Sequence, residues 1–344
     1  MQLICIQVQP PSRLRARSGW IALVLTLALG VLGGWNPWAV QGAETAPSPR
    51  RGTGPLKVLT TIAPIYSWTA AIAGTNASVE NLLPSDIGPH DFQFRPRDLK
   101  RLESADLILM NGLGLELWLE RTLKASATRS AIPRVAVTRG WPDSSLIHEL
   151  PELPGLNEKK REHDHDHGHD HDHDGGANPH LWLDPVFARH AVTNILQALV
   201  TADPANAPAY QTNAAAYLAR LIQLDRDFQQ ATESWRGRPL VTFHDAFPYF
   251  CRRYALNLVG VVEEVPGTGP SPRHLASLMR VIREQKVRVI FTETQFNPRL
   301  ARQLASDLSI PVAELEVLET GALSATAYED GQRRNLETLR KLLR

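Results

Sequence analysis

The stretch KVLTTIAPIYSWTAAIAG (residues 57–74) contains the local pattern from which the fold class can be predicted. Residues 57–61 form a short apolar run that is typical of a buried strand. Residues 66–73 have the composition of a helix, and Gly74 is a common residue just past a helix end. A strand followed directly by a helix is the repeating unit of a parallel sheet covered by helices. This stretch therefore predicts an α/β protein.

The same alternation recurs on both sides of a helical segment. Towards the N-terminus, further strands are predicted at residues 79–83, 105–110 and 134–137, with helices at 97–104 and 115–125. The helical segment is predicted at residues 185–200 and 205–235. After Gly237 the alternation resumes at residues 240–243, 256–262, 274–284, 287–292, 298–308 and 311–315, and a last helix is predicted at 327–343. The pattern predicts two lobes, each a mostly parallel sheet flanked by helices, joined by a long helix. Ligands of such folds bind outside the carboxyl ends of the strands, which here means the cleft between the lobes.

The N-terminal residues have the order of a secretory signal peptide. Arg13, Arg15 and Arg17 precede an apolar run at residues 20–35, and small residues follow near Gly42. An uncleaved anchor is the alternative, but a run of about 16 residues is shorter than the roughly 20 that span a bilayer. We expect a cleaved signal peptide and a periplasmic location. The predicted organisation is a signal peptide (1–42), a flexible leader (43–55), an N-terminal lobe (56–185) carrying a loop rich in histidine and aspartate (158–177), a helical segment (186–237) and a C-terminal lobe (238–344).

The charge balance excludes one class of partner. The 344 residues include 37 basic and 36 acidic side chains, a formal net charge of +1. Removal of the signal peptide with its three arginines would leave 34 basic against 36 acidic residues. A nucleic-acid-binding surface requires a basic excess, which this chain lacks. We expect no nucleic-acid partner, and we expect a monomer.

Residues 163–174, HDHDHGHDHDHD, contain six histidines and five aspartates in twelve positions. Such a polar run cannot form a packed core, so we expect a loop. Imidazoles alternating with carboxylates offer many donor atoms to transition metals. We expect weak metal binding there, because a flexible chain loses entropy when it binds. The expected donors are His163, His165, His167, His169, His171 and His173.

Six histidines lie outside that run, and three of them occupy loops that follow predicted strands. His90 comes soon after residues 79–83, His180 lies just past the histidine-rich run, and His244 directly follows residues 240–243. These are the positions at which α/β proteins bind ligands. His148, His190 and His274 have no such placement, and we assign them no role.

Four motifs stand out along the chain: Pro89-His90 with Pro96-Arg97-Asp98-Leu99, Asn178-Pro179-His180-Leu181-Trp182-Leu183-Asp184-Pro185, Phe243-His244-Asp245-Ala246-Phe247, and Phe291-Thr292-Glu293. Together they resemble the zinc/manganese solute-binding family of ABC transporters. The acidic histidine-rich insert is similar to that of the zinc-specific branch. The resemblance covers residues 56–344. It implies two α/β lobes joined by a rigid helix, a metal between them, and a cognate ABC permease in the cytoplasmic membrane as the partner.

The resemblance also implies the ligands of the transported Zn²⁺. His90, His180 and His244 fall on the family's three histidine positions, and Glu316 falls on its aspartate position. Glu319 or a water molecule remains an alternative for the fourth ligand. Three imidazoles and one carboxylate suit tetrahedral Zn²⁺.

Three other functions remain open at this point. A manganese-binding relative is one, although manganese prefers more oxygen ligands than this set provides. A secreted zinc hydrolase is the second, but the chain has no His-Glu-x-x-His motif. Metal-dependent adhesion or storage is the third. Asp245, beside His244, is either a general base or a support for a ligand. The expected function is therefore zinc capture outside the cytoplasmic membrane, without catalysis.

Overall fold

A computed structural model describes residues 54–148, 153, 176–264 and 267–343. The chain divides into two units, residues 1–42 and 43–344, and the described residues all belong to the second. The predicted signal peptide and the histidine-rich run at residues 163–174 lie outside them. Among the described residues, no helix combines the length and the apolar character that crossing a bilayer requires.

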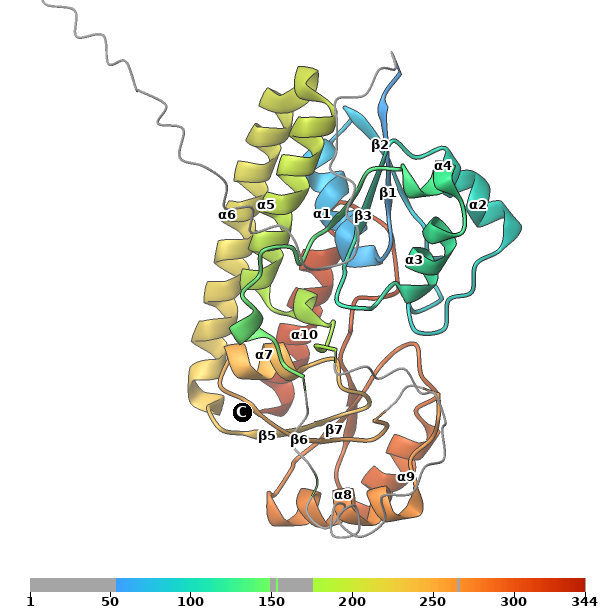
Figure 1. Ribbon diagram of the computed structural model, residues 1–344. Coiled ribbons are helices and arrows are strands. Elements are labelled where there is room, and N and C mark those ends of the chain that lie inside the picture. The colour runs from blue at the N-terminus through green and yellow to red at the C-terminus, as the bar shows by residue number, and fades with distance from the viewer. Residues whose placement is uncertain (1–53, 149–152, 154–175, 265–266, 344) are drawn as a thin grey trace, which may run out of the picture. The chain divides into compact units, whose positions relative to one another are not determined.

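Two four-stranded parallel sheets form the framework, and both have the same strand order (Figure 1). The first sheet has the order β2-β1-β3-β4, from strands β1 (Leu56–Thr60), β2 (Ala77–Asn81), β3 (Leu107–Met110) and β4 (Arg134–Ala136). The second has the order β6-β5-β7-β8, from strands β5 (Pro239–Thr242), β6 (Asn257–Val261), β7 (Ile290–Thr292) and β8 (Val312–Glu314). In each sheet the order in which strands are added reverses between two adjacent strands, β1 and β3 in the first sheet and β5 and β7 in the second. Such a reversal opens a crevice at the carboxyl ends of these strands.

Helices cover both faces of each sheet. Around the first sheet lie α1 (Ala63–Ala73), α2 (Pro96–Glu103), α3 (Leu117–Lys124), α4 (Ala127–Ser130) and α5 (Pro185–Ala202). Around the second lie α7 (Pro248–Arg253), α8 (Pro272–Glu284), α9 (Arg299–Leu308) and α10 (Ala327–Leu342). Local sequence explains several helix starts. The Asp184 side chain accepts a hydrogen bond from Val186 N at 2.8 Å ahead of α5, and Ser271 accepts one from His274 N at 3.1 Å in α8.

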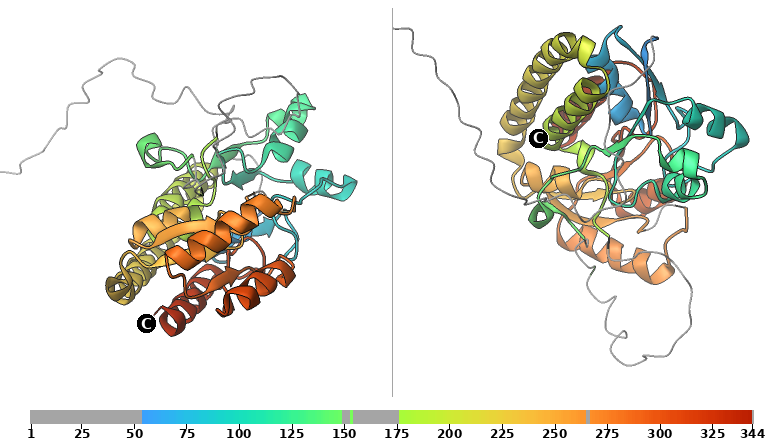
Figure 2. Two further views of the ribbon diagram at one scale, coloured as in Figure 1. Left: turned by 90° about the horizontal axis from the view of Figure 1, so that it is seen from below. Right: turned by 45° about the horizontal axis from the view of Figure 1, so that its top comes forward.

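The long helix α6 (Ala207–Thr232) runs beside α5 and connects the two lobes (Figures 1 and 2). Its 26 residues correspond to about 39 Å of helix at 1.5 Å per residue. Its buried face carries the stripe that the sequence indicates, which consists of Tyr210, Ala214, Tyr217, Leu221, Leu224 and Phe228. Because this stripe packs into the protein along most of its length, α6 is a rigid connection rather than a free linker.

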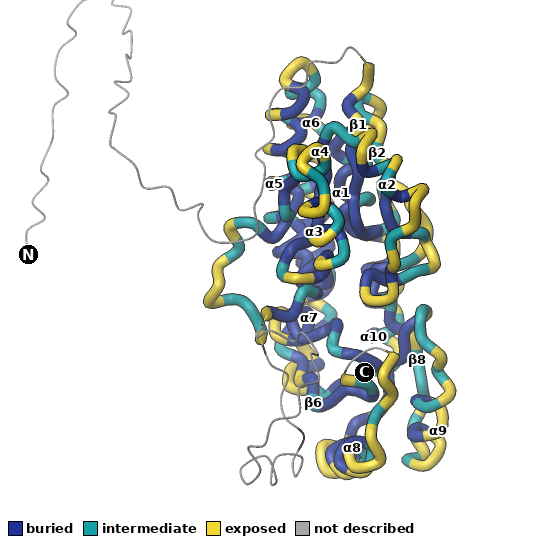
Figure 3. Tube along the Cα trace, turned by 45° about the vertical axis from the view of Figure 1, so that its right-hand side comes forward, coloured by how far each residue is buried: buried dark blue, intermediate teal, exposed yellow. Residues whose placement is uncertain are grey.

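The two lobes share one apolar core. A single cluster of buried side chains extends from Leu56 in β1 to Leu343 after α10, whereas a second cluster lies under α8 and α9. Along the Cα trace, buried stretches run through both lobes (Figure 3). The last helix returns to the first lobe, where the ring centroids of Tyr328 and Trp68 are 5.1 Å apart. Tyr328 N also donates a hydrogen bond to the hydroxyl of Ser67 at 3.1 Å. The lobe boundary drawn from the sequence therefore crosses a continuous core.

The fold class predicted from the sequence is confirmed. Both sheets are parallel, helices flank them, and a long helix connects them. The element bounds differ by a few residues. The strand predicted at residues 79–83 is Ala77–Asn81, and the helix predicted from residue 66 begins at Ala63, because Pro64 is well tolerated in a first helical turn.

Candidate metal centre

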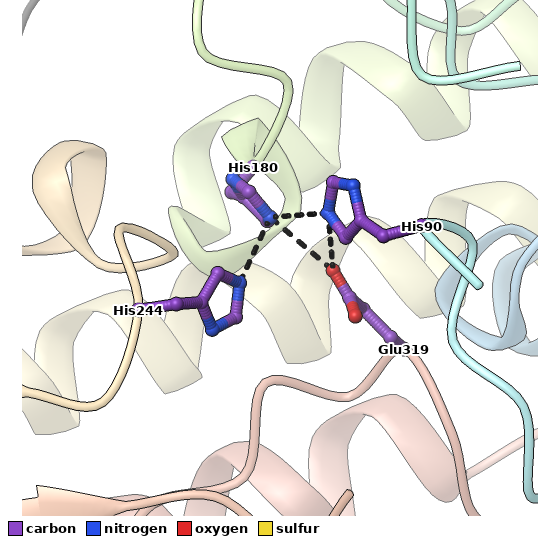
Figure 4. A group of neighbouring side chains, drawn as sticks. All are labelled: His90, His180, His244 and Glu319. Atoms are coloured by element: carbon purple, nitrogen blue, oxygen red, sulfur yellow. Dashed lines mark hydrogen bonds and ion pairs between the residues drawn. The ribbon is translucent and has the colours of Figure 1, made fainter. Parts of the chain in front are cut away.

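Four side chains from distant parts of the sequence meet between the lobes (Figure 4). They are His90, from the loop between β2 and α2; His180, just before α5; His244, just after β5; and Glu319, after β8. Each offers one ligand atom, and these atoms all lie within 4.8 Å of one another. The structure thus brings together the three histidines expected from the sequence, with a different glutamate from the one expected.

The spacing of the donor atoms suits a small four-coordinate cation. The Nε2 atom of His180 is 3.3 Å from Nε2 of His90 and 3.3 Å from Nε2 of His244. Oε1 of Glu319 is 3.3 Å from Nε2 of His180 and 3.8 Å from Nε2 of His90. A tetrahedral Zn²⁺ site with metal–ligand distances of about 2.0–2.1 Å has edges of about 3.3–3.4 Å. Three of these four separations match that edge, and the fourth is slightly longer.

An unpartnered oxygen supports the same interpretation. Glu319 is 2% exposed, and its Oε1 has no hydrogen-bond partner among the described residues. A buried carboxylate oxygen without a donor is costly, and a cation at this point would satisfy it. Burial raises the pKa of Glu319, while the nearby His90 and His244 act to lower it.

The orientation of His180 is fixed through Asn178. The Asn178 amide group donates to the carbonyl of Asp245 at 2.8 Å and to its carboxylate at 2.9 Å. Its Oδ1 is therefore directed at His180, where it lies 3.0 Å from both the backbone N and Nδ1. Nδ1 of His180 consequently carries the proton, and Nε2 is left as the acceptor that faces the group. Asp245 thus acts through Asn178 as a support for a candidate ligand.

The segment that carries His180 is also held to the first sheet. Asn111, at the end of β3, donates a side-chain hydrogen bond to the carbonyl of Pro179 at 3.1 Å. The buried carboxylate of Glu116 accepts hydrogen bonds from Asn111 N at 2.7 Å and from the hydroxyl of Thr61 at 2.7 Å. Burial raises the pKa of Glu116 to about 7, against the effect of these hydrogen bonds. The carboxyl ends of β1 and β3 therefore provide a fixed base for the His180 segment.

His244 is supported by a carboxylate on the neighbouring strand. His244 follows β5 and Glu293 follows β7, at the point where the strand order reverses. Nδ1 of His244 lies 2.5 Å from Oε2 of Glu293, and His244 N donates to Oε1 at 3.1 Å. Burial lowers the pKa of His244, but the neighbouring carboxylates, with Glu293 the strongest of them, together raise it to about 9. A carboxylate on the far ring nitrogen fixes the ring and makes it a stronger donor to a metal.

His90 and His180 are held in the neutral form that a metal requires. Burial lowers the pKa of His90 to about 4 and the pKa of His180 to about 3. Both are therefore unprotonated at neutral pH. His90 is the most exposed member, with 31% of its side chain accessible against 2% for His180. The group thus has one member at the surface and three in the interior.

The expectation for Glu316 requires a correction. Its carboxylate forms an ion pair with Arg334 of α10, with Nη2 to Oε2 at 2.8 Å. Its backbone N and O bond the side chain of Asn335, each at 2.7 Å. Leu318 then takes a left-handed conformation with φ of 68°, which is uncommon for leucine and turns Glu319 inward. Glu319, the alternative considered from the sequence, therefore occupies the position expected of Glu316.

Two of the histidines without an assigned role have other partners. Nε2 of His190 donates to the carbonyl of Arg139 at 2.7 Å, and Nε2 of His274 donates to the carbonyl of Val261 at 2.8 Å. His148 is exposed and does not belong to the group. The six histidines of the run at residues 163–174 lie outside the described residues.

Sequence reasoning missed three supporting residues. Asn178 and Glu293 lie in the motifs quoted above but received no role there, and Gln295 went unnoticed. Nε2 of Gln295 donates to Oε2 of Glu319 at 3.1 Å. Their position was the only signal in the sequence. Glu293 and Gln295 come just after the end of β7, and that end lies beside the end of β5, which leads to His244.

Replacing Glu293 with glutamine tests the support of His244. We expect zinc affinity to fall by roughly 10- to 100-fold, the usual effect of losing a partner behind a metal ligand. The measurement is competition for Zn²⁺ against a chromogenic chelator. Glu284→Gln, the same change at an exposed residue of α8 in the same lobe and outside the group, serves as the control. An unchanged affinity of Glu293→Gln would show that the ring needs no carboxylate behind it.

The fold and the side-chain group together define a class. Two parallel α/β lobes, connected by a packed helix and enclosing three histidines and a carboxylate, are the architecture of a metal-binding solute-binding protein. The chain belongs to the family described as the zinc-uptake complex component A, periplasmic, whose model matches residues 58–342. The members of this family are metal-binding proteins and not enzymes.

Curated relatives carry zinc in their names. The chain is 29% identical over 293 residues to the zinc-binding protein AdcA of Streptococcus pyogenes serotype M3, covering 83% of this chain and 56% of AdcA. It therefore spans about half the length of that relative. It is 30% identical over 292 residues to the high-affinity zinc uptake system protein ZnuA of Bacillus subtilis, covering 84% of this chain and 88% of ZnuA.

Solved structures share the fold. The solute-binding protein FpvC of Pseudomonas aeruginosa in complex with Mn²⁺ superimposes with a TM-score of 0.70 at 28% identity, covering 84% of this chain and 98% of FpvC. The laminin-binding protein Lmb of Streptococcus agalactiae, described as having adhesin and metal transporting activity, gives a TM-score of 0.69 at 26% identity, with 84% and 100% covered. FpvC has also been solved with Ni²⁺, so this fold accommodates different metals.

Proposed function

We propose that this protein binds Zn²⁺ through His90, His180, His244 and Glu319 and delivers it to an ABC permease in the cytoplasmic membrane. One observation carries the proposal most directly. Three imidazole Nε2 atoms and an unpartnered, buried carboxylate oxygen converge with spacings close to the edge of a zinc tetrahedron. The names of the relatives point to the same ion.

Ligand chemistry favours zinc over manganese. Imidazole nitrogen suits Zn²⁺, Cu²⁺ and Ni²⁺, whereas Mn²⁺ prefers carboxylate, carbonyl and water oxygens. The group supplies three nitrogen atoms and one inward-facing oxygen. A manganese carrier remains the second candidate, because FpvC binds Mn²⁺ on this fold.

Four protein ligands also favour carriage over hydrolysis. Catalytic zinc sites usually keep one position open for water, while closed sites use four protein ligands. Here Glu319 would fill the fourth position. A bound ion would therefore have no activated water, which suits a protein that must hold its cargo and release it unchanged.

Titration with Zn²⁺ and Mn²⁺ distinguishes these candidates. Residues 43–344, the expected exported form, should bind one Zn²⁺ tightly and Mn²⁺ much more weakly in chelator competition. Manganese affinity equal to that of zinc would favour the second candidate. The absence of any tight site would exclude both.

Export and the partner follow from the same proposal. The basic and apolar N-terminus would direct the chain across the cytoplasmic membrane, where residues 1–42 would be removed. Mass spectrometry of the exported chain should find a mature N-terminus near Ala43. Zinc uptake by cells would then depend on both this protein and its permease.

Deleting residues 163–174 should separate two kinds of zinc binding. We expect the deletion to remove the weaker binding events and to leave one tight site, because a polar run cannot preorganise its donors as the lobes do. Isothermal titration calorimetry of the two forms provides the measurement. If the deletion abolished the tight event instead, the tight site would lie in the run and not between the lobes.

A further inference from the structure

The two carboxylate oxygens of Glu319 have different surroundings. Oε1 faces the histidine rings and has no hydrogen-bond partner in the described part of the chain, whereas Oε2 is turned away from them (Figure 4). Oε2 accepts a hydrogen bond from Nε2 of Gln295 at 3.1 Å. On another side it lies against Gly88 in the loop of His90, 3.5 Å from the point where a Cβ would be. One oxygen is thus engaged by the protein while the other is available.

The position of Gln295 is itself fixed. The loop that follows β7 is closed by a hydrogen bond from Phe296 N to the carbonyl of Glu293 at 3.3 Å. The Phe296 ring stacks on Phe243 with centroids 5.0 Å apart and meets the His244 ring edge-on at 5.3 Å. Gln295 therefore lies between Glu293 and Phe296, which these contacts hold in place. Its amide is directed at Glu319 before any metal arrives.

We propose that Gln295 is a specificity-determining residue that keeps Glu319 monodentate and so favours a four-coordinate ion. This inference rests on the metal site proposed above. A carboxylate can bind a metal through one oxygen or two. With both oxygens bound, three histidines and Glu319 would supply five donor atoms. With Oε2 held by the Gln295 amide, they supply four.

The number of donor atoms separates the competing ions. Zn²⁺ in a closed protein site is almost always tetrahedral, with four ligands. Mn²⁺ prefers octahedral coordination rich in oxygen. Losing Oε2 removes one of the few oxygen atoms that Mn²⁺ would use, whereas Zn²⁺ needs only the remaining one. Gln295 thereby opposes manganese without touching the metal.

Gln295→Met tests the inference, because methionine has a similar length and lacks the amide donor. The probe is Co²⁺, whose visible absorption is intense in four-coordinate sites and weak in five- or six-coordinate ones. Both forms should lack residues 163–174, so that metal binding in that run does not contribute. Gln303→Met is the matched control, since Gln303 also donates to a carboxylate, Oδ1 of Asp307 at 2.9 Å, but on the surface of α9.

We expect an intense cobalt spectrum from the wild type and from Gln303→Met, and a markedly weaker one from Gln295→Met. The ratio of zinc affinity to manganese affinity should fall about 10-fold or more in Gln295→Met, in line with the effect of partners behind a ligand. Gln295→Ala, which also removes the donor, should behave in the same way.

Two results would overturn the inference while leaving the proposed function intact. One is a Gln295→Met protein with the wild-type cobalt spectrum and the wild-type selectivity. The other is a wild-type protein that binds zinc tightly but holds cobalt with five or six ligands. A wild type that takes up neither metal tightly would contradict the proposed function itself.

Discussion

Replacing His180 with alanine is expected to weaken zinc binding by roughly 100- to 1,000-fold. Four-ligand zinc sites bind with about 10–16 kcal/mol, so one ligand contributes about 2.5–4 kcal/mol on an even division. His180 should lie at the upper end of this range, because its Nε2 is 3.3 Å from each of the two other histidine nitrogens and from Oε1 of Glu319. The measurement is chelator competition with the form that lacks residues 163–174.

His148→Ala is the control for this experiment. His148 is an exposed histidine outside the group, so its loss should leave zinc affinity unchanged. Because His180 is buried and its ring is 5.0 Å from that of Trp182, His180→Gln provides a second variant of similar size. Circular dichroism and thermal unfolding of the metal-free forms check that both variants fold. Folded variants with wild-type zinc affinity would remove His180 from the site.

Substituting glutamine at Glu319 and at Glu316 should give opposite results. Glu319→Gln replaces the charged oxygen that faces the histidines, and we expect zinc affinity to fall by roughly 10- to 100-fold. This loss is smaller than that of His180→Ala, because the amide oxygen of glutamine can still approach the metal. Glu316→Gln should leave zinc affinity unchanged, since its carboxylate pairs with Arg334 instead.

Thermal unfolding provides a second measurement for this pair. The ion pair of Glu316 is largely at the surface, so its loss should cost no more than about 1 kcal/mol of stability. Glu316→Gln and Glu319→Gln are a matched pair, because they are the same substitution at two residues only three positions apart in the sequence. Weaker zinc binding in Glu316→Gln, with normal binding in Glu319→Gln, would restore the assignment made from the sequence.

The sequence was sufficient for the architecture because its signals are local. Apolar runs of four to six residues alternate with helical stretches in both halves of the chain. The helix predicted from residue 185 begins there, behind Asp184, whereas the start beside Pro64 was placed at residue 66. The amphipathic stripe of α6 follows from a period of 3.6 residues. The three histidines were predicted for a related reason, since each follows a predicted strand or lies in a specific motif, and the structure brings them together.

The fourth position depends on tertiary contacts that no local pattern reveals. Leu318 adopts a left-handed conformation, although leucine disfavours it. Its side chain lies against Gly331 of α10, where an added Cβ would come within 2.2 Å of Leu318 Cδ2. The absence of a side chain at Gly331 therefore lets the turn approach the helix. This contact and the Arg334 ion pair exclude Glu316 from the cleft and admit Glu319.

Spectroscopy or crystallography of the zinc-loaded protein tests the central claim most directly. The sample is the form without residues 163–174, loaded with one equivalent of Zn²⁺. The account predicts a four-coordinate ion bound by Nε2 of His90, His180 and His244 and by one oxygen of Glu319, at about 2.0–2.1 Å. Zinc found with Glu316 as its carboxylate ligand, or outside the group between the lobes, would contradict the account.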